Sequence, residues 1–149
     1  MQITLITVGK LKEDYLKAAE NHFKSLISKH YDFNFINIPD EKIQDGCTEA
    51  AIEAIKNKEG TGILKKIQPG QYVIALAIDG RQLNTEGFKK LIKDCTDAGK
   101  SNLVFVIGGS LGLSAQVLRR ADYKISFSPM TFPHQLMKIM LMEQLSIIL

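Results

Sequence analysis

Short apolar runs alternate with stretches of helical periodicity along the whole chain. The strand-like runs are rich in β-branched residues or alternate apolar with polar positions, and several stop at glycine or proline. They predict five strands, at residues 3–8, 33–38, 72–78, 103–107 and 123–127. Continuous apolar strands separated by helices indicate a mainly parallel sheet with helices on both faces. We therefore expect a single α/β domain over residues 1–149.

Apolar positions that recur every three or four residues predict helices between these strands. The expected helices cover residues 11–27, 48–67, 85–98 and 114–120, followed by a final helix that Pro133 opens. Gly60 and Gly62 weaken the second helix, because a glycine inside a helix costs about 1 kcal/mol relative to alanine. These glycines either break the helix or allow another backbone to approach it closely.

The final helix is apolar around nearly its whole circumference. From Leu136 to Leu149 the large apolar side chains are interrupted by Lys138, Glu143 and Gln144. A helix that is apolar on all sides must be buried on all sides. In a small domain, a second copy of the chain provides that burial most simply, so we expect a homodimer through this helix. An internal core helix is the alternative.

Composition and charge agree with an ordinary globular domain. With 149 residues, 45% of them apolar and 23% charged, the chain can bury a core without disulfides or metal. The net charge of +3 permits a nucleic-acid partner without requiring one. Cys47 and Cys95 fit no metal or redox spacing and indicate free thiols in a reducing cytosol.

Neither a leader nor a membrane span is apparent. The segment MQITLITVGK has no basic residues before its short apolar run, and it resembles a first strand more than a signal peptide. No stretch approaches the ~18 apolar residues that would cross a bilayer. We expect a cytoplasmic protein.

The segment LVFVIGGSLGLS, residues 103–114, is the first candidate for a binding loop. A buried strand that opens into a glycine-rich turn is typical of backbone amides that approach a ligand closely. GGSLGL lacks the lysine and hydroxyl of a P-loop, and it does not fit the GxGxxG fingerprint, which belongs to the first βα unit of a fold. A tight turn that simply needs glycine is the alternative.

The second candidate loop is SFSPMTFPHQ, residues 126–135. Two aromatic residues, a methionine and two prolines form an apolar slot with rigid walls and free backbone groups. Such a slot suits a flat heterocycle, which needs stacking and a few hydrogen bonds. In the alternative interpretation, Phe127 and Phe132 pack into the core.

The remaining chemistry is sparse, and no residue is assigned as catalytic. His22, His30 and His134 are isolated from one another, and no spacing resembles a metal site. His22 and His30 are expected on the surface of the first helix. No nucleophile motif occurs, and nothing near Ser110 would activate it. Catalysis would therefore depend on positioning a reactive cofactor and an acceptor.

Four motifs together resemble a known family. VGKLKEDY, KEG, VIGGSLGL and FSPMTFPHQLM, in this order and over nearly the whole chain, are similar to the RlmH family of the SPOUT superfamily. These are 23S ribosomal RNA methyltransferases. The resemblance implies a trefoil-knotted α/β fold whose C-terminal segment threads a loop. It also implies that S-adenosylmethionine, held in the knot, methylates ring nitrogen 3 of a pseudouridine in the assembled ribosome, without a metal.

The resemblance also places a cofactor site on this chain. The positions that carry over are Leu76, Gly108, Phe127, Ser128, Pro129, Met130, Thr131 and Phe132. The missing Cβ atoms of Gly108 and Gly109 would leave room for the ribose or the methionine moiety. RNA phosphates would be bound across the dimer interface by Arg81, Arg119, Arg120 and Lys124. In the alternative interpretation these four residues are solvated surface cations.

One part of the sequence departs from the family pattern. After Glu143 and Gln144 the family continues with a Tyr-Arg-containing helix and an extended tail, whereas this chain reads LSIIL. The alternative function is therefore a non-catalytic dimeric module that binds S-adenosylmethionine or ribosomes. Saturable cofactor binding without methyl transfer would distinguish this module from an enzyme.

Overall fold

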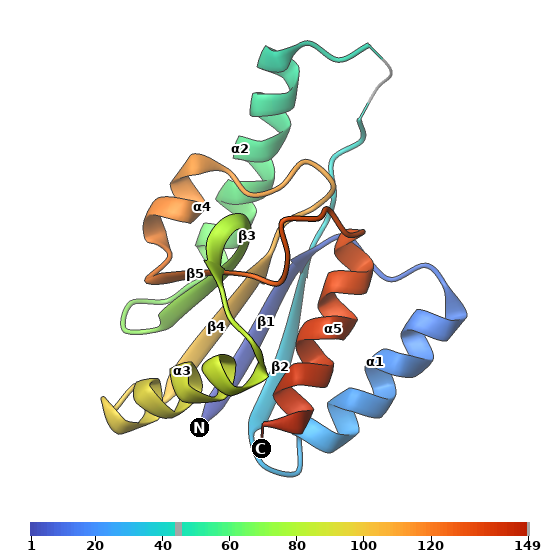
Figure 1. Cartoon of the computed structure of the whole chain (residues 1–149). Coiled ribbons are helices and arrows are strands. Elements are labelled where there is room, and N and C mark those ends of the chain that lie inside the picture. The colour runs from blue at the N-terminus through green and yellow to red at the C-terminus, as the bar shows by residue number, and fades with distance from the viewer. Residues whose placement is uncertain (44–45, 149) are drawn as a thin grey trace.

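The computed structural model describes residues 1–43 and 46–148. Its five-stranded sheet has the strand order β2-β1-β4-β3-β5, and every strand pair is parallel (Figure 1). The strands are β1 (Gln2–Val8), β2 (Asp32–Ile38), β3 (Tyr72–Gln82), β4 (Asn102–Ile107) and β5 (Tyr123–Ser126). The helices are α1 (Asp14–Ile27), α2 (Glu49–Lys66), α3 (Thr85–Asp97), α4 (Ala115–Arg120) and α5 (His134–Ile147). The predicted α/β class is confirmed.

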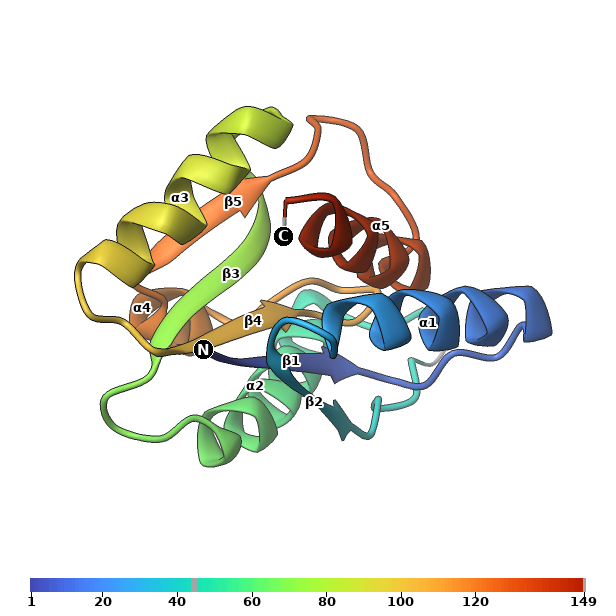
Figure 2. The ribbon, with the colours of Figure 1, turned by 90° about the horizontal axis from the view of Figure 1, so that it is seen from below.

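Helices cover both faces of the sheet, as predicted. Figure 2 shows α1, α3 and α5 on one face and α2 and α4 on the other. The first face holds a core that includes Phe105 and Leu141, and the second holds a smaller core that includes Val106 and Val117. Since β1 and β4 lie inside the sheet and are covered on both sides, all of their residues from Ile3 to Val8 and from Leu103 to Ile107 are buried.

Polar residues fix the starts of three helices. Thr48 caps α2, Asn84 caps α3 and Ser114 caps α4, and each side chain accepts a hydrogen bond from a backbone N–H of the first turn. Two predicted starts were wrong by a few residues. The first helix begins at Asp14 instead of residue 11, and Pro133 precedes the first residue of α5, where its carbonyl accepts from the Met137 N–H at 3.0 Å.

Strand β3 extends beyond its predicted end at residue 78. Leu76 and Arg81 both pair with Ile125 of β5, so the chain between them bulges out of the sheet. A Cβ atom at Gly80 would lie 2.7 Å from the carbonyl carbon of Ile125, which explains the glycine. Asp79 and Gly80 therefore mark a bulge within the strand, although as a pair they are typical of a turn.

Helix α2 continues through both of its glycines. A Cβ atom at Gly60 would overlap the Ser114 side chain, and one at Gly62 would lie 3.0 Å from Cγ2 of Ile38. The expected close approach is thus confirmed, but the approaching groups are side chains and not another backbone. Gly60 seats α2 against the capped start of α4.

Helix α5 packs mainly against its own domain. Its buried residues include Leu141, Met142 and Leu145, and the charged Lys138 is only 4% exposed. The internal-core alternative accounts for this face, so burial on all sides by a second copy is not required. Leu136 and Ile147 remain exposed, at 38% and 54%. The homodimer and the knot stay predictions. Of the helices in the described ranges, none is long and apolar enough to cross a membrane.

Candidate functional site

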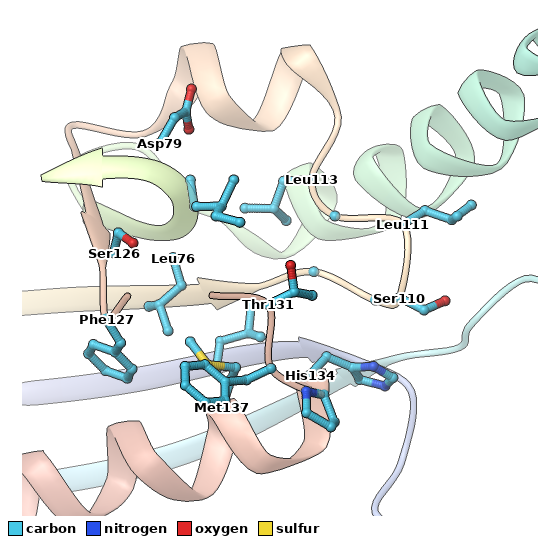
Figure 3. Close-up of a pocket in the computed structure, with 18 of the residues that line it drawn as sticks. Leu76, Asp79, Ser110, Leu111, Leu113, Ser126, Phe127, Thr131, His134 and Met137 are labelled. Carbon is cyan, nitrogen blue, oxygen red and sulfur yellow. The ribbon is translucent and has the colours of Figure 1, made fainter. Parts of the chain in front are cut away.

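A cavity of about 740 Å³ opens at one edge of the sheet, between the bulged part of β3 and the loops that follow β4 and β5 (Figure 3). Parallel α/β sheets characteristically bind ligands beyond the carboxyl ends of their strands. Three segments form most of the wall, namely residues 76–79, 107–113 and 125–134, with Lys56, Leu118 and Met137. The two candidate loops, which the family resemblance assigns to one cofactor site, therefore border one cavity.

The predicted cofactor residues converge on this cavity, with one exception. The residues that line it are Leu76, Gly108, Phe127, Ser128, Met130, Thr131 and Phe132. Pro129 is exposed and lies outside the lining. The wall combines apolar side chains with hydroxyl groups and the Asp79 carboxyl group, so it can hold an amphipathic ligand.

Hydroxyl groups shape the segment that follows β5. The Ser126 hydroxyl donates to the Ser128 carbonyl at 3.0 Å, and the Ser128 hydroxyl accepts from the Met130 N–H at 3.0 Å. Ser126 is buried, whereas Met130 is 70% exposed. These short-range bonds hold the turn, which leaves Phe127 to line the cavity.

The glycine loop needs its glycines for a reason other than the predicted one. A Cβ atom at Gly108 would lie 2.7 Å from the carbonyl carbon of Gly112, and one at Gly109 would lie 3.2 Å from Cγ1 of Val8. Both missing side chains would therefore meet protein atoms. The expectation that they make room for the ligand is corrected: they let the loop fold back on itself, with the Gly112 N–H donating to the Gly109 carbonyl at 3.0 Å.

Glu59, in the KEG motif, received no role from the sequence. It is 6% exposed, and its Oε2 accepts from the Glu41 N–H at 3.0 Å. Its Oε1 lies 3.4 Å from the position of a Cβ atom on Gly109, directly behind the glycine loop. The neighbouring Lys58 Nζ reaches Glu41 Oε1 at 3.2 Å. The motif thus ties the segment after β2 to the back of the cavity wall.

Burial gives Glu59 a pH-dependent effect on stability. Desolvation raises the pKa of its carboxyl group, and the nearby Asp40 and Glu41 also raise it, against the hydrogen bond from the Glu41 N–H. A raised folded-state pKa means that the folded state retains the proton longer than the unfolded state. Its contribution is complete below the ordinary value of 4.5 and is lost as the pH rises through the folded pKa.

We expect this contribution to appear on comparison with Glu59→Gln, which keeps an acceptor for the Glu41 N–H and removes the ionisation. From pH 4 upwards, wild type should lose stability relative to the variant until Glu59 is ionised in both states. Urea unfolding across this range measures the difference. Glu53→Gln, at an exposed position on the same helix, is the control. Parallel pH curves for wild type and Glu59→Gln would contradict the assignment.

Other lining residues also escaped prediction. Asp79 comes directly after the apolar run of β3, so its position at the carboxyl edge of the sheet was the available signal. His134 lines the cavity as the first residue of α5, and burial lowers the pKa of its imidazole. By contrast, His22 is exposed on α1 as predicted, while His30 is exposed just after that helix.

The cations predicted to contact RNA lie outside the cavity lining. Arg81, Arg119 and Lys124 are exposed, on β3, α4 and β5 respectively. Arg120 donates to the Gln71 carbonyl at 3.1 Å and to Asp122 Oδ2 at 3.2 Å. Arg120 therefore braces the start of β3, and RNA contact by these four residues stays a prediction.

The structure also shows where the potential metal ligands and the two thiols lie. Within residues 1–43 and 46–148, no three histidine, cysteine, aspartate or glutamate side chains are grouped to hold a metal ion. Cys47 and Cys95 are free, and Cys95 is buried in the core near Phe88 and Ile92.

The fold is a parallel α/β sheet with a cavity formed mainly by loops from the last third of the chain. Known proteins with this class of site can therefore be compared with it. The family model described as "Predicted SPOUT methyltransferase" matches residues 1–146, and the chain belongs to this family of methyltransferases. The resemblance inferred from the four motifs is thereby confirmed.

Among curated relatives, "Ribosomal RNA large subunit methyltransferase H" of Alkaliphilus oremlandii is 52% identical over 145 residues, covering 97% of this chain and 91% of that protein. The proteins of the same name from Clostridium kluyveri and Clostridioides difficile are 49% and 50% identical, with the same coverage of both chains.

Proposed function

We propose that this methyltransferase acts on 23S ribosomal RNA in the assembled ribosome. It transfers a methyl group from S-adenosylmethionine to ring nitrogen 3 of a pseudouridine. The observation that carries the proposal is the convergence of both late loops on one cavity, in a chain 52% identical to a ribosomal RNA large subunit methyltransferase. We also propose that it works in the cytoplasm, where ribosomes are.

The cavity suits S-adenosylmethionine in size and chemistry. A volume of about 740 Å³ lies in the range of small-molecule sites. Leu76, Phe127 and Phe132 offer apolar surface to adenine, and the backbone of residues 127–132 offers polar groups to its edge. The Asp79 carboxyl group suits the hydroxyl or ammonium groups.

The residues proposed to hold this cofactor are Leu76, Gly108, Phe127, Ser128, Pro129, Met130, Thr131 and Phe132, with Pro129 shaping the turn. When bound, S-adenosylmethionine supplies a methyl group that its positively charged sulfur already activates. The protein then has to orient the acceptor nitrogen, exclude water and accept a proton. This chemistry requires no metal.

The acceptor side of the proposal combines surface cations with a dimer. Arg81, Arg119 and Lys124 are exposed and can approach phosphates, and Arg120 can contribute while it braces β3. We propose dimerisation through the face of α5 that bears Leu136, Met140 and Ile147, because these residues lie at helical spacing and two of them are exposed.

Transfer of labelled methyl from S-adenosylmethionine to ribosomes that lack the modification tests the proposal. We expect incorporation into the large-subunit RNA, with a mass increase of one methyl group at a pseudouridine. Cofactor binding without incorporation would instead favour the non-catalytic module. No saturable cofactor binding would overturn the site assignment itself.

A blocking variant links this activity to the cavity. Thr131 is exposed at the rim, so Thr131→Trp can obstruct the site without disturbing the core. We expect cofactor affinity to fall at least ~10-fold, equivalent to about 1.4 kcal/mol, with an unchanged unfolding midpoint. Thr61→Trp, on the exposed side of α2, is the matched control and should bind as wild type does.

A further inference from the structure

We propose that His134 is the catalytic base that takes the proton from the acceptor nitrogen, and that Asp40 is the residue that positions its imidazole. This inference rests on the proposed function and deepens it. The sequence assigned no base, because His134 stands alone among its neighbours in the chain. The structure supplies both a location and a partner.

His134 is placed at the boundary between the cofactor loop and the final helix. It is the first residue of α5, follows the 127–132 segment directly, and lines the same cavity as that segment. Figure 3 shows its imidazole projecting away from Met137, on the same side of the view as Ser110 and Leu111 of the glycine loop. The imidazole is therefore part of the cavity wall that would surround a ligand held by both loops.

Asp40 and the imidazole of His134 lie on either side of a space that a glycine leaves open. A Cβ atom at Gly9 would lie 3.6 Å from His134 Nε2 and 3.7 Å from Asp40 Cγ. Both groups thus border one small space at the end of β1. Gly9 also has φ +85°, a conformation that side chains disfavour, and its N–H donates to the Ile38 carbonyl at 2.8 Å.

The segment that carries Asp40 is itself anchored. The next residue, Glu41, donates its backbone N–H to the buried Glu59 at 3.0 Å and pairs with Lys58 at 3.2 Å. Asp40 is therefore attached to the scaffold behind the glycine loop. From this position the Asp40 carboxylate acts on the imidazole through its charge, and a small side-chain movement would let it orient the ring.

The electrostatic surroundings favour the form that can accept a proton. Burial lowers the pKa of the His134 imidazole, the charge of Asp40 opposes that effect, and the charge of Lys12 adds to it. Lys12 stands before α1, and its N–H donates to the Gln135 side chain at 3.3 Å. With its pKa below the ordinary 6.5, the imidazole is mainly neutral at pH 7.

Other ionisable groups in the wall suit this task less well. Lys56 is paired with Glu53 at 3.7 Å, and an ammonium group offers hydrogen-bond donors but no acceptor. Asp79 offers a carboxylate, which is generally a weaker base than an imidazole. Ser110 is a hydroxyl without a base to activate it.

The proposed step balances as a simple substitution. The neutral imidazole takes the proton from ring nitrogen 3 of the pseudouridine. The electron pair left on that nitrogen forms the new bond to the methyl carbon as the bond from this carbon to the sulfur breaks. Sulfur leaves as a neutral thioether with the electron pair of the broken carbon–sulfur bond, and the imidazolium near Asp40 then gives its proton to water.

His134→Asn tests the assignment, with His30→Asn at an exposed position as the matched control. A lost general base lowers a rate by roughly 100-fold or more, so we expect kcat to fall by that factor in His134→Asn and to stay unchanged in His30→Asn. Cofactor affinity, measured by calorimetry, should change little. If His134→Asn folds poorly, His134→Gln gives the same comparison with a longer side chain.

A second measurement does not depend on turnover. Asp40 raises the pKa of His134, so Asp40→Asn should lower that pKa further, as followed by NMR titration of the labelled imidazole. The acid limb of the pH profile of kcat should move to lower pH by the same amount as the pKa of His134. A merely structural role for Asp40 would leave the limb where it is.

The outcomes separate this inference from the proposed function. An active wild type with an equally active His134→Asn overturns the base alone. A wild type that methylates no ribosome overturns the proposed function, and the base falls with it. An unchanged His134 pKa in Asp40→Asn overturns the positioning role.

Discussion

Replacing Lys138 with alanine is expected to lower the free energy of unfolding by about 3 kcal/mol. Lys138 is 4% exposed, its Nζ lies 2.7 Å from Glu20 Oε2, and it stands 4.4 Å from the centre of the Phe35 ring. Removing it leaves the Glu20 carboxylate, itself 22% exposed, without its partner and opens a gap between α1 and α5. Denaturant unfolding measures the loss.

A double-mutant cycle separates the charge from the packing. Lys138→Met keeps most of the aliphatic contact, and Glu20→Leu removes the opposite charge. We expect each single variant to be destabilised, but the pair Lys138→Met with Glu20→Leu to be close to wild type, since apolar replacement of a buried ion pair is often neutral. A coupling energy near zero between positions 20 and 138 would show that the pair contributes nothing.

Gly80→Ala is the second substitution with a large expected effect. Its new Cβ atom would lie 2.7 Å from the carbonyl carbon and 2.9 Å from the nitrogen of Ile125, and backbone cannot move aside as a flexible side chain can. Separating β3 from β5 at this point should cost about 3 kcal/mol, at the upper end of the usual range for overpacking. Thermal and denaturant unfolding both report it.

Gly87→Ala provides the control for the loss of a glycine. It lies within α3, where its new Cβ atom would lie 3.2 Å from the side-chain oxygen of Asn84, the N-cap of the same helix, and alanine favours the helix. We expect it to be nearly neutral. The bulge beside Gly80 also carries Leu76 and Asp79 into the cavity wall, so Gly80→Ala should weaken ligand binding as well. Equal stability of the two variants would refute this packing argument.

The sequence predicted most of the fold because its signals are local. Strand β4 is buried on both faces and therefore shows a continuous apolar run from Leu103 to Ile107. Ser114 caps α4 through a hydrogen bond to the Val117 N–H, within its own first turn. The two binding loops carry glycine or proline and aromatic residues in short segments, so both could be identified from the sequence, and the family resemblance assigned them to one site.

What the sequence did not predict depends on contacts between distant residues. The bulge at Gly80 requires Ile125 beside it, and the burial of Lys138 requires Glu20 of α1. The proposed role of His134 depends on Asp40, which is far from it in the sequence but near it in the structure. Local periodicity contains no information on such pairs.

The strand order also determines when the sheet can assemble during synthesis and which fragments of the chain can fold. Strand β3 pairs only with β4 and β5, whereas β1 pairs only with β2 and β4, so β4 is the sole bridge between the two halves of the described sheet. While residues 102–107 are still inside the ribosome, β4 cannot join the β1–β2 pair to β3. The edges of these strands then keep unpaired backbone N–H and C=O groups. Native assembly must therefore wait for the last third of the polypeptide, and a fragment that ends before β4 would be prone to aggregation.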